Sequence, residues 1–242
     1  MERIFSGKKA LVIGGTGGIG KAVALRLGAR GARVFIQGGS SPERLEGTVK
    51  VIRDAGGEAE GFLCDAALPE SAADILGRVP SPDILVCAWG PYKRAALDEL
   101  SARDWLFLTV NNLALPGILI SSVLGDMIRK KWGRILLFGG TNTDTIRGFS
   151  TTAAYSAAKT ALGVVAKSVA LTAGPHGVSC NVVCPGLTDT EYTGEDAGNY
   201  NRERSPGGIP LNSSEIADLA VQILEHSPVN GAIIPIDRGL KL

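Results

Sequence analysis

The chain has 242 residues, of which 45% are hydrophobic and 20% charged, and its formal net charge is +1. This balance is typical of a globular protein and argues against the concentrated charge that nucleic-acid or membrane-surface binding requires. The apolar stretches are interrupted by glycine, proline or charge, and the N-terminus has no apolar leader. We therefore expect one cytoplasmic domain over residues 1–242 that binds neither nucleic acid nor membrane.

The cysteine and histidine positions give no pattern typical of metal ligands. The four cysteines lie mostly in apolar runs and none forms a Cys-x-x-Cys pair, while the two histidines are far apart. Buried free thiols are the expected state of Cys64, Cys87, Cys180 and Cys184. No metal site is predicted.

Short, continuous apolar runs predict strands that are buried on both faces of a parallel sheet. These runs are Ala10–Ile13, Val34–Gln37, Ile84–Ala88, Ile135–Phe138, Ser179–Val183 and Ile233–Ile236. Helix-length segments separate them: Lys21–Arg30, Pro42–Ala55, Leu68–Val79, Arg103–Lys131, Ala153–Gly174 and Ser213–His226. The alternation predicts an α/β, doubly wound parallel sheet, the Rossmann fold, in a single domain. The polar stretch Gly186–Pro210 is expected to be an irregular, mobile flap.

The glycine-rich segment Val12–Gly20 joins the first predicted strand to the first predicted helix. Glycine leaves room where this turn tightens and the backbone approaches a pyrophosphate, and the helix N-terminus offers N–H groups to phosphates. The predicted coenzyme contacts here are Gly14, Thr16, Gly17, Gly18, Ile19 and Gly20. A flexible loop is the alternative interpretation. The spacing Gly-x-x-x-Gly-x-Gly resembles the coenzyme turn of the short-chain dehydrogenase/reductase family, and the resemblance extends over essentially the whole chain.

Tyr155 and Lys159 stand four residues apart and project from one side of a predicted helix. An ammonium beside a phenol, together with the positive nicotinamide ring when it is oxidised, favours the phenolate and would bring the pKa of Tyr155 down toward neutrality. This pair alone also occurs by chance in many helices, but its place after Ile135–Phe138 and before Pro185-Gly186 favours the catalytic interpretation. The resemblance implies that Tyr155 protonates the substrate carbonyl and that Lys159 also binds the nicotinamide ribose.

Further roles follow from the resemblance. It implies that Asn111 holds a proton-relay water, although the neighbouring Asn112 leaves the register open by one residue. The coenzyme contacts that it implies are Asp65, Gly90, Pro185, Gly186, Thr188 and Thr190. In the segment Cys87-Ala88-Trp89-Gly90 the amides of the family pattern are replaced while its glycine is kept, and Trp89 either narrows the nicotinamide pocket or packs in the core.

The chain departs from the family where a catalytic serine is usual, because Gly139-Gly140 stands there after Gly133-Arg134-Ile135. The missing hydroxyl normally polarises the substrate oxygen, and such a donor is worth about 2–4 kcal/mol in a transition state. Thr141 is the predicted replacement, with Asn142 and Thr143 as neighbouring candidates. Ordinary turn residues are the alternative interpretation.

The end of the second predicted strand indicates the coenzyme preference. An acidic residue there would bind a ribose 2′-hydroxyl and repel a 2′-phosphate, whereas this chain has Gly38. Ser40, Ser41 and Arg44 offer donors to a 2′-phosphate. NADP(H) is therefore the expected coenzyme, with NAD(H) as the second choice.

We expect an oxidoreductase that reduces a ketone, with a 3-oxoacyl thioester as one candidate substrate, by hydride transfer from NADPH. The alternatives are a dehydrogenase that works toward oxidation and an NADP-binding regulatory or scaffold relative with little or no activity, which Gly140 and the altered segment Cys87–Gly90 motivate. The expected partner is a small carbonyl or alcohol substrate. The C-terminal segment Gly231–Gly239 resembles a family strand that is often buried between subunits, which implies a homotetramer or dimer.

Overall fold

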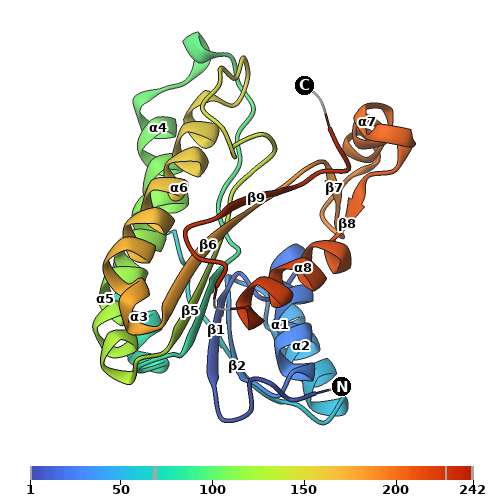
Figure 1. The fold of residues 1–242 in the computed structure, drawn as a ribbon. Coiled ribbons are helices and arrows are strands. Elements are labelled where there is room, and N and C mark those ends of the chain that lie inside the picture. Colours follow the sequence, from blue (N-terminus) through green and yellow to red (C-terminus); the bar gives the residue numbers. More distant parts are fainter. Residues whose placement is uncertain (1, 68–69, 227, 241–242) are drawn as a thin grey trace.

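A sheet of seven parallel strands forms the centre of the molecule, in the order β3-β2-β1-β4-β5-β6-β9 (Figure 1). The computed structural model describes residues 2–67, 70–226 and 228–240. The strands are β1 (Lys9–Ile13), β2 (Arg33–Gly38), β3 (Glu58–Leu63), β4 (Ile84–Cys87), β5 (Gly133–Phe138), β6 (Val178–Pro185) and β9 (Ile233–Ile236). The predicted doubly wound Rossmann-type fold is confirmed.

Helices cover both faces of this sheet (Figure 1). One layer holds α1 (Gly18–Ala29), α2 (Pro42–Asp54) and α8 (Ser213–Glu225), and the other holds α3 (Ser71–Arg78), α4 (Ala102–Thr109), α5 (Leu115–Lys130) and α6 (Ala153–Ala173). Successive residues of a strand point to opposite faces, so Val12 packs in one core with Leu27, and Ile13 packs in the other with Leu119. This burial on both sides explains why the central strands are continuous apolar runs.

Strand β3 has no apolar run in the sequence because it lies at the edge of the sheet. It alternates exposed Glu58 and Glu60 with the buried Ala59, and only β2 pairs with it. Charged edge strands of this kind discourage pairing with other chains. Helix α3 begins at Ser71, and the predicted start at Leu68 lies outside the described residues.

The predicted helix Arg103–Lys131 consists of α4, a π-helical turn over Val110–Ala114, and α5. By length and composition this is the one helical run among the described residues that is apolar enough to cross a membrane. Its buried side, including Leu108 and Leu119, packs into the core, as in the core helix of a globular domain. The π-helical turn carries both Asn111 and Asn112, so its geometry decides which of the two side chains faces the candidate site.

The expected irregular structure of the stretch Gly186–Pro210 is wrong for parts of it. It holds the short strand β7 (Thr188–Asp189), which pairs with β8 (Leu211–Asn212), and then helix α7 (Glu195–Arg204). Helix α7 is polar throughout and lacks an apolar period. Acidic residues in its first turn and arginines in its last turn match the helix dipole, which stabilises it.

Candidate active site

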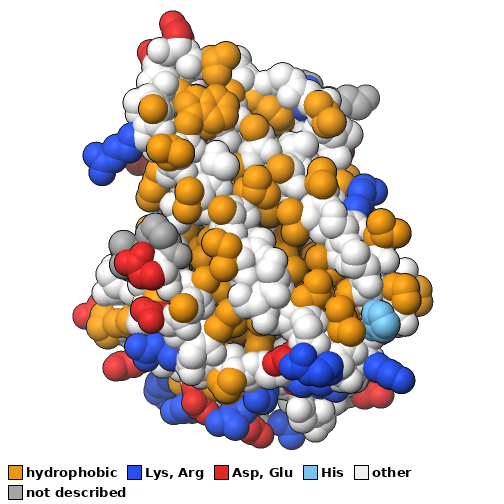
Figure 2. Space-filling model, turned by 90° about the vertical axis from the view of Figure 1, so that its left-hand side faces the viewer, with side chains coloured by type: hydrophobic (Ala, Val, Ile, Leu, Met, Phe, Trp, Pro, Cys, Tyr) orange, Lys and Arg blue, Asp and Glu red, His pale blue; other side chains and the backbone are white. Residues whose placement is uncertain are grey.

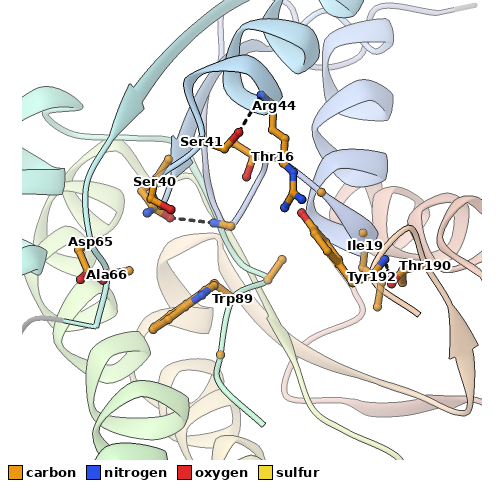
Figure 3. A pocket seen from close by; sticks show the side chains of 17 residues that line it. Thr16, Ile19, Ser40, Ser41, Arg44, Asp65, Ala66, Trp89, Thr190 and Tyr192 are labelled. Carbon is orange, nitrogen blue, oxygen red and sulfur yellow. Dashed lines mark hydrogen bonds between the residues drawn. The ribbon is translucent and has the colours of Figure 1, made fainter. Parts of the chain in front are cut away.

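A cleft lies at the carboxyl ends of the strands, where ligands bind in doubly wound sheets (Figure 3). Its volume is about 490 Å³. The predicted coenzyme residues that line it are Gly14, Thr16, Gly17, Gly18, Ile19, Ser40, Ser41, Asp65, Gly90 and Thr190. The fold therefore gathers segments from along most of the chain into one groove.

The glycine-rich turn is built as the sequence predicts. Gly14 has φ +75°, and a Cβ at this position would lie 2.6 Å from the Cβ of Trp89. A Cβ on Gly20 would lie 2.2 Å from the Gly14 carbonyl oxygen. Gly20 therefore does not line the cleft but permits close packing of α1 on the turn.

Gln37, which the sequence reading missed, holds this turn in place. Its buried side chain accepts a hydrogen bond from the Gly14 N–H (2.9 Å) and donates to the Cys64 carbonyl oxygen (2.6 Å). The amide thereby ties β1 to the end of β3. The sequence pattern that could have identified Gln37 is a polar residue at the end of the apolar run Phe35-Ile36.

The two sides of the cleft carry different chemistry (Figure 3). On one side the Asp65 carboxylate accepts from the Ala67 N–H at 2.9 Å, and on the other the guanidinium of Arg44 lies 4.9 Å from the ring centroid of Tyr192. Trp89 lines the cleft and also packs against one core.

Tyr192 and Glu191, also missed from the sequence, lie against the phosphate-binding turn. A Cβ on Gly17 would lie 1.8 Å from the Tyr192 hydroxyl oxygen, so a side chain at position 17 would require the Tyr192 ring to move. The Glu191 carboxylate accepts a hydrogen bond of 2.9 Å from the Gly18 N–H at the start of α1. An anion thus already sits on the helix terminus that is suited to a pyrophosphate, which supports the fit of this turn to the coenzyme.

Because Glu191 uses an N–H that a bound coenzyme phosphate would need, Glu191→Gln is expected to tighten NADPH binding. A carboxylate at a helix N-terminus is worth about 0.3–1 kcal/mol, which corresponds to a two- to five-fold lower Kd. Isothermal titration calorimetry of NADPH binding to the wild type and to Glu191→Gln measures the two Kd values. Glu195→Gln, in the first turn of α7, is the matched control, and weaker binding by Glu191→Gln would show that the carboxylate helps the coenzyme instead.

A second cavity of about 470 Å³ lies beside Tyr155. The Tyr155 side chain lines it, and the Tyr92 ring contacts Tyr155 edge-on with 5.1 Å between the centroids. Burial, with smaller contributions from Tyr92 and Cys184, raises the pKa of Tyr155 above its ordinary value. Burial, the largest of these effects, thus shifts this pKa in the direction opposite to the predicted lowering, which stays a prediction for the coenzyme-bound enzyme.

Lys159 is buried on the next turn of α6, with its Nζ 5.8 Å from the centre of the Tyr155 ring. The ammonium donates to the Phe138 carbonyl oxygen at 2.9 Å and lies 3.2 Å from a Cβ built on Gly90. Burial lowers the pKa of Lys159 to about 8, against smaller raising effects of Cys87 and Cys184. The side chain therefore connects the sheet, the coenzyme cleft and Tyr155.

The structure brings Asn112, rather than Asn111, close to this group. A Cβ on Gly90 would lie 2.1 Å from the Asn112 Oδ1, whereas the side-chain oxygens of both asparagines are buried without a hydrogen-bond partner among the described residues. The Asn112 amide donates to the carbonyl oxygens of Pro91 and Leu108, whereas Asn111 donates to Phe107. The adjacent asparagines gave no sequence signal that separates them.

Gly140 stands where a serine side chain would face Tyr155, since a Cβ on it would lie 2.9 Å from the Tyr155 hydroxyl oxygen. The three candidate donors that follow differ in their bonds. Thr141 donates to the Pro185 carbonyl oxygen at 3.3 Å, and Thr143 is buried in a turn with Gly140. Asn142 lines the second cavity, and its amide nitrogen is buried with no partner in the described part of the chain.

The remaining predicted coenzyme residues lie at the end of β6. Gly186 donates its N–H to the Ile236 carbonyl oxygen, and the Thr188 hydroxyl donates to Gly186 at 2.9 Å. Pro185, Gly186 and Thr188 line neither cavity, while Thr190 reaches the coenzyme cleft. Cys87, Cys180 and Cys184 are buried free thiols, Cys64 is partly exposed, and residues 2–67, 70–226 and 228–240 contain no cluster of potential metal ligands.

A doubly wound parallel sheet with a glycine-rich turn and a Tyr-x-x-x-Lys helix defines a nicotinamide-dependent oxidoreductase. The family model described as short chain dehydrogenase matches residues 8–201, and the chain belongs to this family.

Two relatives and one solved structure illustrate the similarity. The chain is 36% identical over 187 residues to the granaticin polyketide synthase putative ketoacyl reductase 1 of Streptomyces violaceoruber, covering 75% of this chain and 68% of the relative. It is 31% identical to the 3-oxoacyl-[acyl-carrier-protein] reductase FabG of Pseudomonas aeruginosa, covering 97% of both chains. The crystal structure of a 3-oxoacyl (acyl-carrier-protein) reductase from Agrobacterium tumefaciens with NADP bound matches with a TM-score of 0.89 and 27% identity, covering 97% of this chain and 95% of that one.

Proposed function

We propose that this enzyme reduces a ketone by hydride transfer from NADPH, with Tyr155 as the proton donor and Lys159 as its partner. One observation carries the proposal. Two side chains on adjacent turns of α6 serve two cavities: Tyr155 lines the second cavity, while the Lys159 Nζ reaches Gly90 at the wall of the coenzyme cleft. A substrate carbonyl beside Tyr155 would thus lie next to the coenzyme site.

NADPH, when bound, supplies the hydride. Tyr155 is a protonated phenol at neutral pH, since burial shifts its pKa further above the ordinary tyrosine value, and this phenol carries the proton that the carbonyl oxygen would receive. Lys159 would bind the ribose from its place beside Gly90, and the buried Asn112 oxygen would accept from the water that returns a proton to this group. Two relatives are named as a putative ketoacyl reductase and a 3-oxoacyl-[acyl-carrier-protein] reductase. These names favour a 3-oxoacyl thioester among the possible ketones.

Stopped-flow absorbance of NADPH with a panel of ketones, quinones and 3-oxoacyl thioesters tests this function. Consumption of NADPH with at least one ketone is expected. Gly140 favours a second candidate, a coenzyme-binding relative with little catalysis, because the usual hydroxyl is missing. Tight NADPH binding without consumption across the whole panel would favour that candidate over the reductase.

The preference for NADPH rests on the end of β2. Arg44 lines the cleft with Ser40 and Ser41, and no acidic residue follows Gln37 before Pro42. Arg44→Ala is expected to raise the KM for NADPH by about ten-fold, because a charge-assisted contact to the 2′-phosphate is lost, and to leave the KM for NADH unchanged. Steady-state kinetics with both coenzymes measures this, and an equal effect on both would contradict a 2′-phosphate contact.

The amide of Asn142 is our candidate for the missing serine hydroxyl, in preference to the predicted Thr141. Its nitrogen is buried beside the second cavity without a partner among the described residues, whereas the Thr141 hydroxyl already donates to Pro185. Asn142 has φ +59°, a conformation that asparagine and glycine adopt readily.

Asn142→Gly removes this amide without straining the backbone and is expected to lower kcat/KM for the ketone by about 10²-fold, the cost of losing one oxyanion donor. Thr141→Val is expected to have a much smaller effect. The Kd for NADPH should be the same in both variants. The reverse order of the two kcat/KM values would restore Thr141 as the donor.

We also propose that the chain forms a homo-oligomer through its α4–α6 face. Figure 2 shows hydrophobic side chains spread over this side of the molecule. The exposed members include Leu106, Phe107, Ile118, Val164 and Leu171. Apolar patches of this kind usually mark interfaces. Sedimentation equilibrium is expected to give a dimer or tetramer, and a monomer at micromolar concentration would contradict the proposal.

A further inference from the structure

The second cavity has a strongly basic wall. Arg94 comes from the loop after β4, Arg147 from the loop after β5, and Arg204 ends helix α7. The other described residues that line it are hydroxyl, amide, aromatic, aliphatic or glycine residues, and none is acidic. Three segments that are distant in sequence therefore bring positive charge to the cavity that contains Tyr155.

Arg94 and Arg204 share one aromatic ring. Their guanidinium carbons lie 5.3 and 5.0 Å from the ring centroid of Tyr200, which also lines the cavity. In the described part of the chain neither has an ion-pair partner, whereas Arg26, Arg33 and Arg238 each pair with a carboxylate. Both guanidinium groups thus flank one ring at the wall of the cavity without an ion-pair partner, and the planar fork of a guanidinium matches carboxylate and phosphate oxygens.

We infer that the substrate carries a carboxylate or phosphate group that binds Arg94 and Arg204 while its ketone faces Tyr155. This inference rests on the proposed reductase function and specifies its substrate class. The coenzyme phosphates do not account for these arginines, since Arg44 and the α1 N-terminus belong to the other cavity. A volume of about 470 Å³ suits a small keto acid or the end of a carrier-bound acyl chain. Arg147 is the third cation of the wall, and the inference does not depend on it.

Paired substrates test the inference with the full-length enzyme and NADPH. The first pair is 4-oxopentanoate and its methyl ester, and the second is the 3-oxobutanoyl thioester of pantetheine 4′-phosphate and that of N-acetylcysteamine. In at least one pair, kcat/KM is expected to be about ten-fold higher for the anionic member. A preference in the first pair indicates a free keto acid as the substrate, and a preference in the second pair indicates a phosphate-bearing carrier arm.

Arg94→Gln and Arg204→Gln are expected to abolish that preference while leaving turnover of the neutral member unchanged. Both side chains are exposed, so these variants should keep the fold, which circular dichroism checks. Arg202→Gln is the matched control, because Arg202 lies on the same helix but bonds the Asn199 side chain. A preference that persists in both arginine variants overturns the inference.

Two other outcomes separate this inference from the proposed function. If neutral ketones are consumed as well as anionic ones in both pairs, the reductase function stands and the anion site is rejected. If no ketone is consumed, calorimetric titration of the same four compounds decides. Arginine-dependent binding of an anionic member then upholds the anion site although the reductase function fails, and equal or absent binding rejects both.

Discussion

Tyr155→Phe is expected to lower kcat for ketone reduction by about 10²–10⁴-fold, the usual contribution of a positioned general acid. The change removes only the hydroxyl, so the ring still packs against Tyr92 and the Kd for NADPH should not change. Because the pKa of Tyr155 is raised, the wild-type side chain is a protonated phenol at neutral pH, and the substitution therefore removes a proton donor. Stopped-flow kinetics with a saturating ketone measures the effect.

Tyr92→Phe is the matched control for this variant. Tyr92 lines the same cavity and contacts Tyr155, but it is more exposed and is not on α6. We expect its loss to change kcat by less than about ten-fold, a fraction of a general-acid effect. If Tyr92→Phe were the inert variant and Tyr155→Phe kept full activity, the assignment of the acid would be wrong.

Lys159→Met is expected to lower kcat by about 10²–10³-fold, because one preorganised cationic donor is removed from the site. In the wild type the pKa of Lys159 is lowered to about 8, so the free enzyme loses the cation as the pH rises through 8. The kcat/KM of the wild type should therefore fall above about pH 8. Lys167→Met, an exposed lysine on the same helix, should leave the profile unchanged.

The same ionisation predicts how stability depends on pH. Between pH 8 and the ordinary lysine pKa of 10.5, the unfolded chain binds the Lys159 proton and the folded chain does not. The free energy of unfolding of the wild type should therefore rise with pH across this window, relative to Lys159→Met. Urea denaturation at pH 7 and pH 10 measures the difference, and parallel curves for the two proteins would contradict a buried lysine.

The central part of the fold follows from sequence because the strands buried on both faces leave continuous apolar runs. The predicted Ile135–Phe138 lies within the observed Gly133–Phe138. Strand β3 and helix α7 could not be predicted from the sequence, because neither has an apolar pattern. Strand β3 is a charged edge strand, and α7 is too polar to show a helical apolar period. Both elements are stabilised by neighbours and end charges instead of a buried stripe.

Some parts of the candidate site could likewise be predicted from the sequence and others could not. Glycine spacing and the Tyr155–Lys159 pair are local patterns, so the sequence alone locates them. The contacts of Glu191 with Gly18, of Asn112 with Gly90, and of Arg94 with Tyr200 join segments that are remote in sequence. Such contacts depend on how loops cross the ends of the strands, which no local pattern describes.

Isotope transfer tests the central claim most directly. The enzyme is incubated with NADPH deuterated at the transferable position of the nicotinamide and with an accepted ketone, and the alcohol is analysed by mass spectrometry. One deuterium per molecule of alcohol is expected with the wild type, and a loss of product with Tyr155→Phe. Deuterium-free alcohol, or equal product from both proteins, would contradict hydride transfer with Tyr155 as the acid.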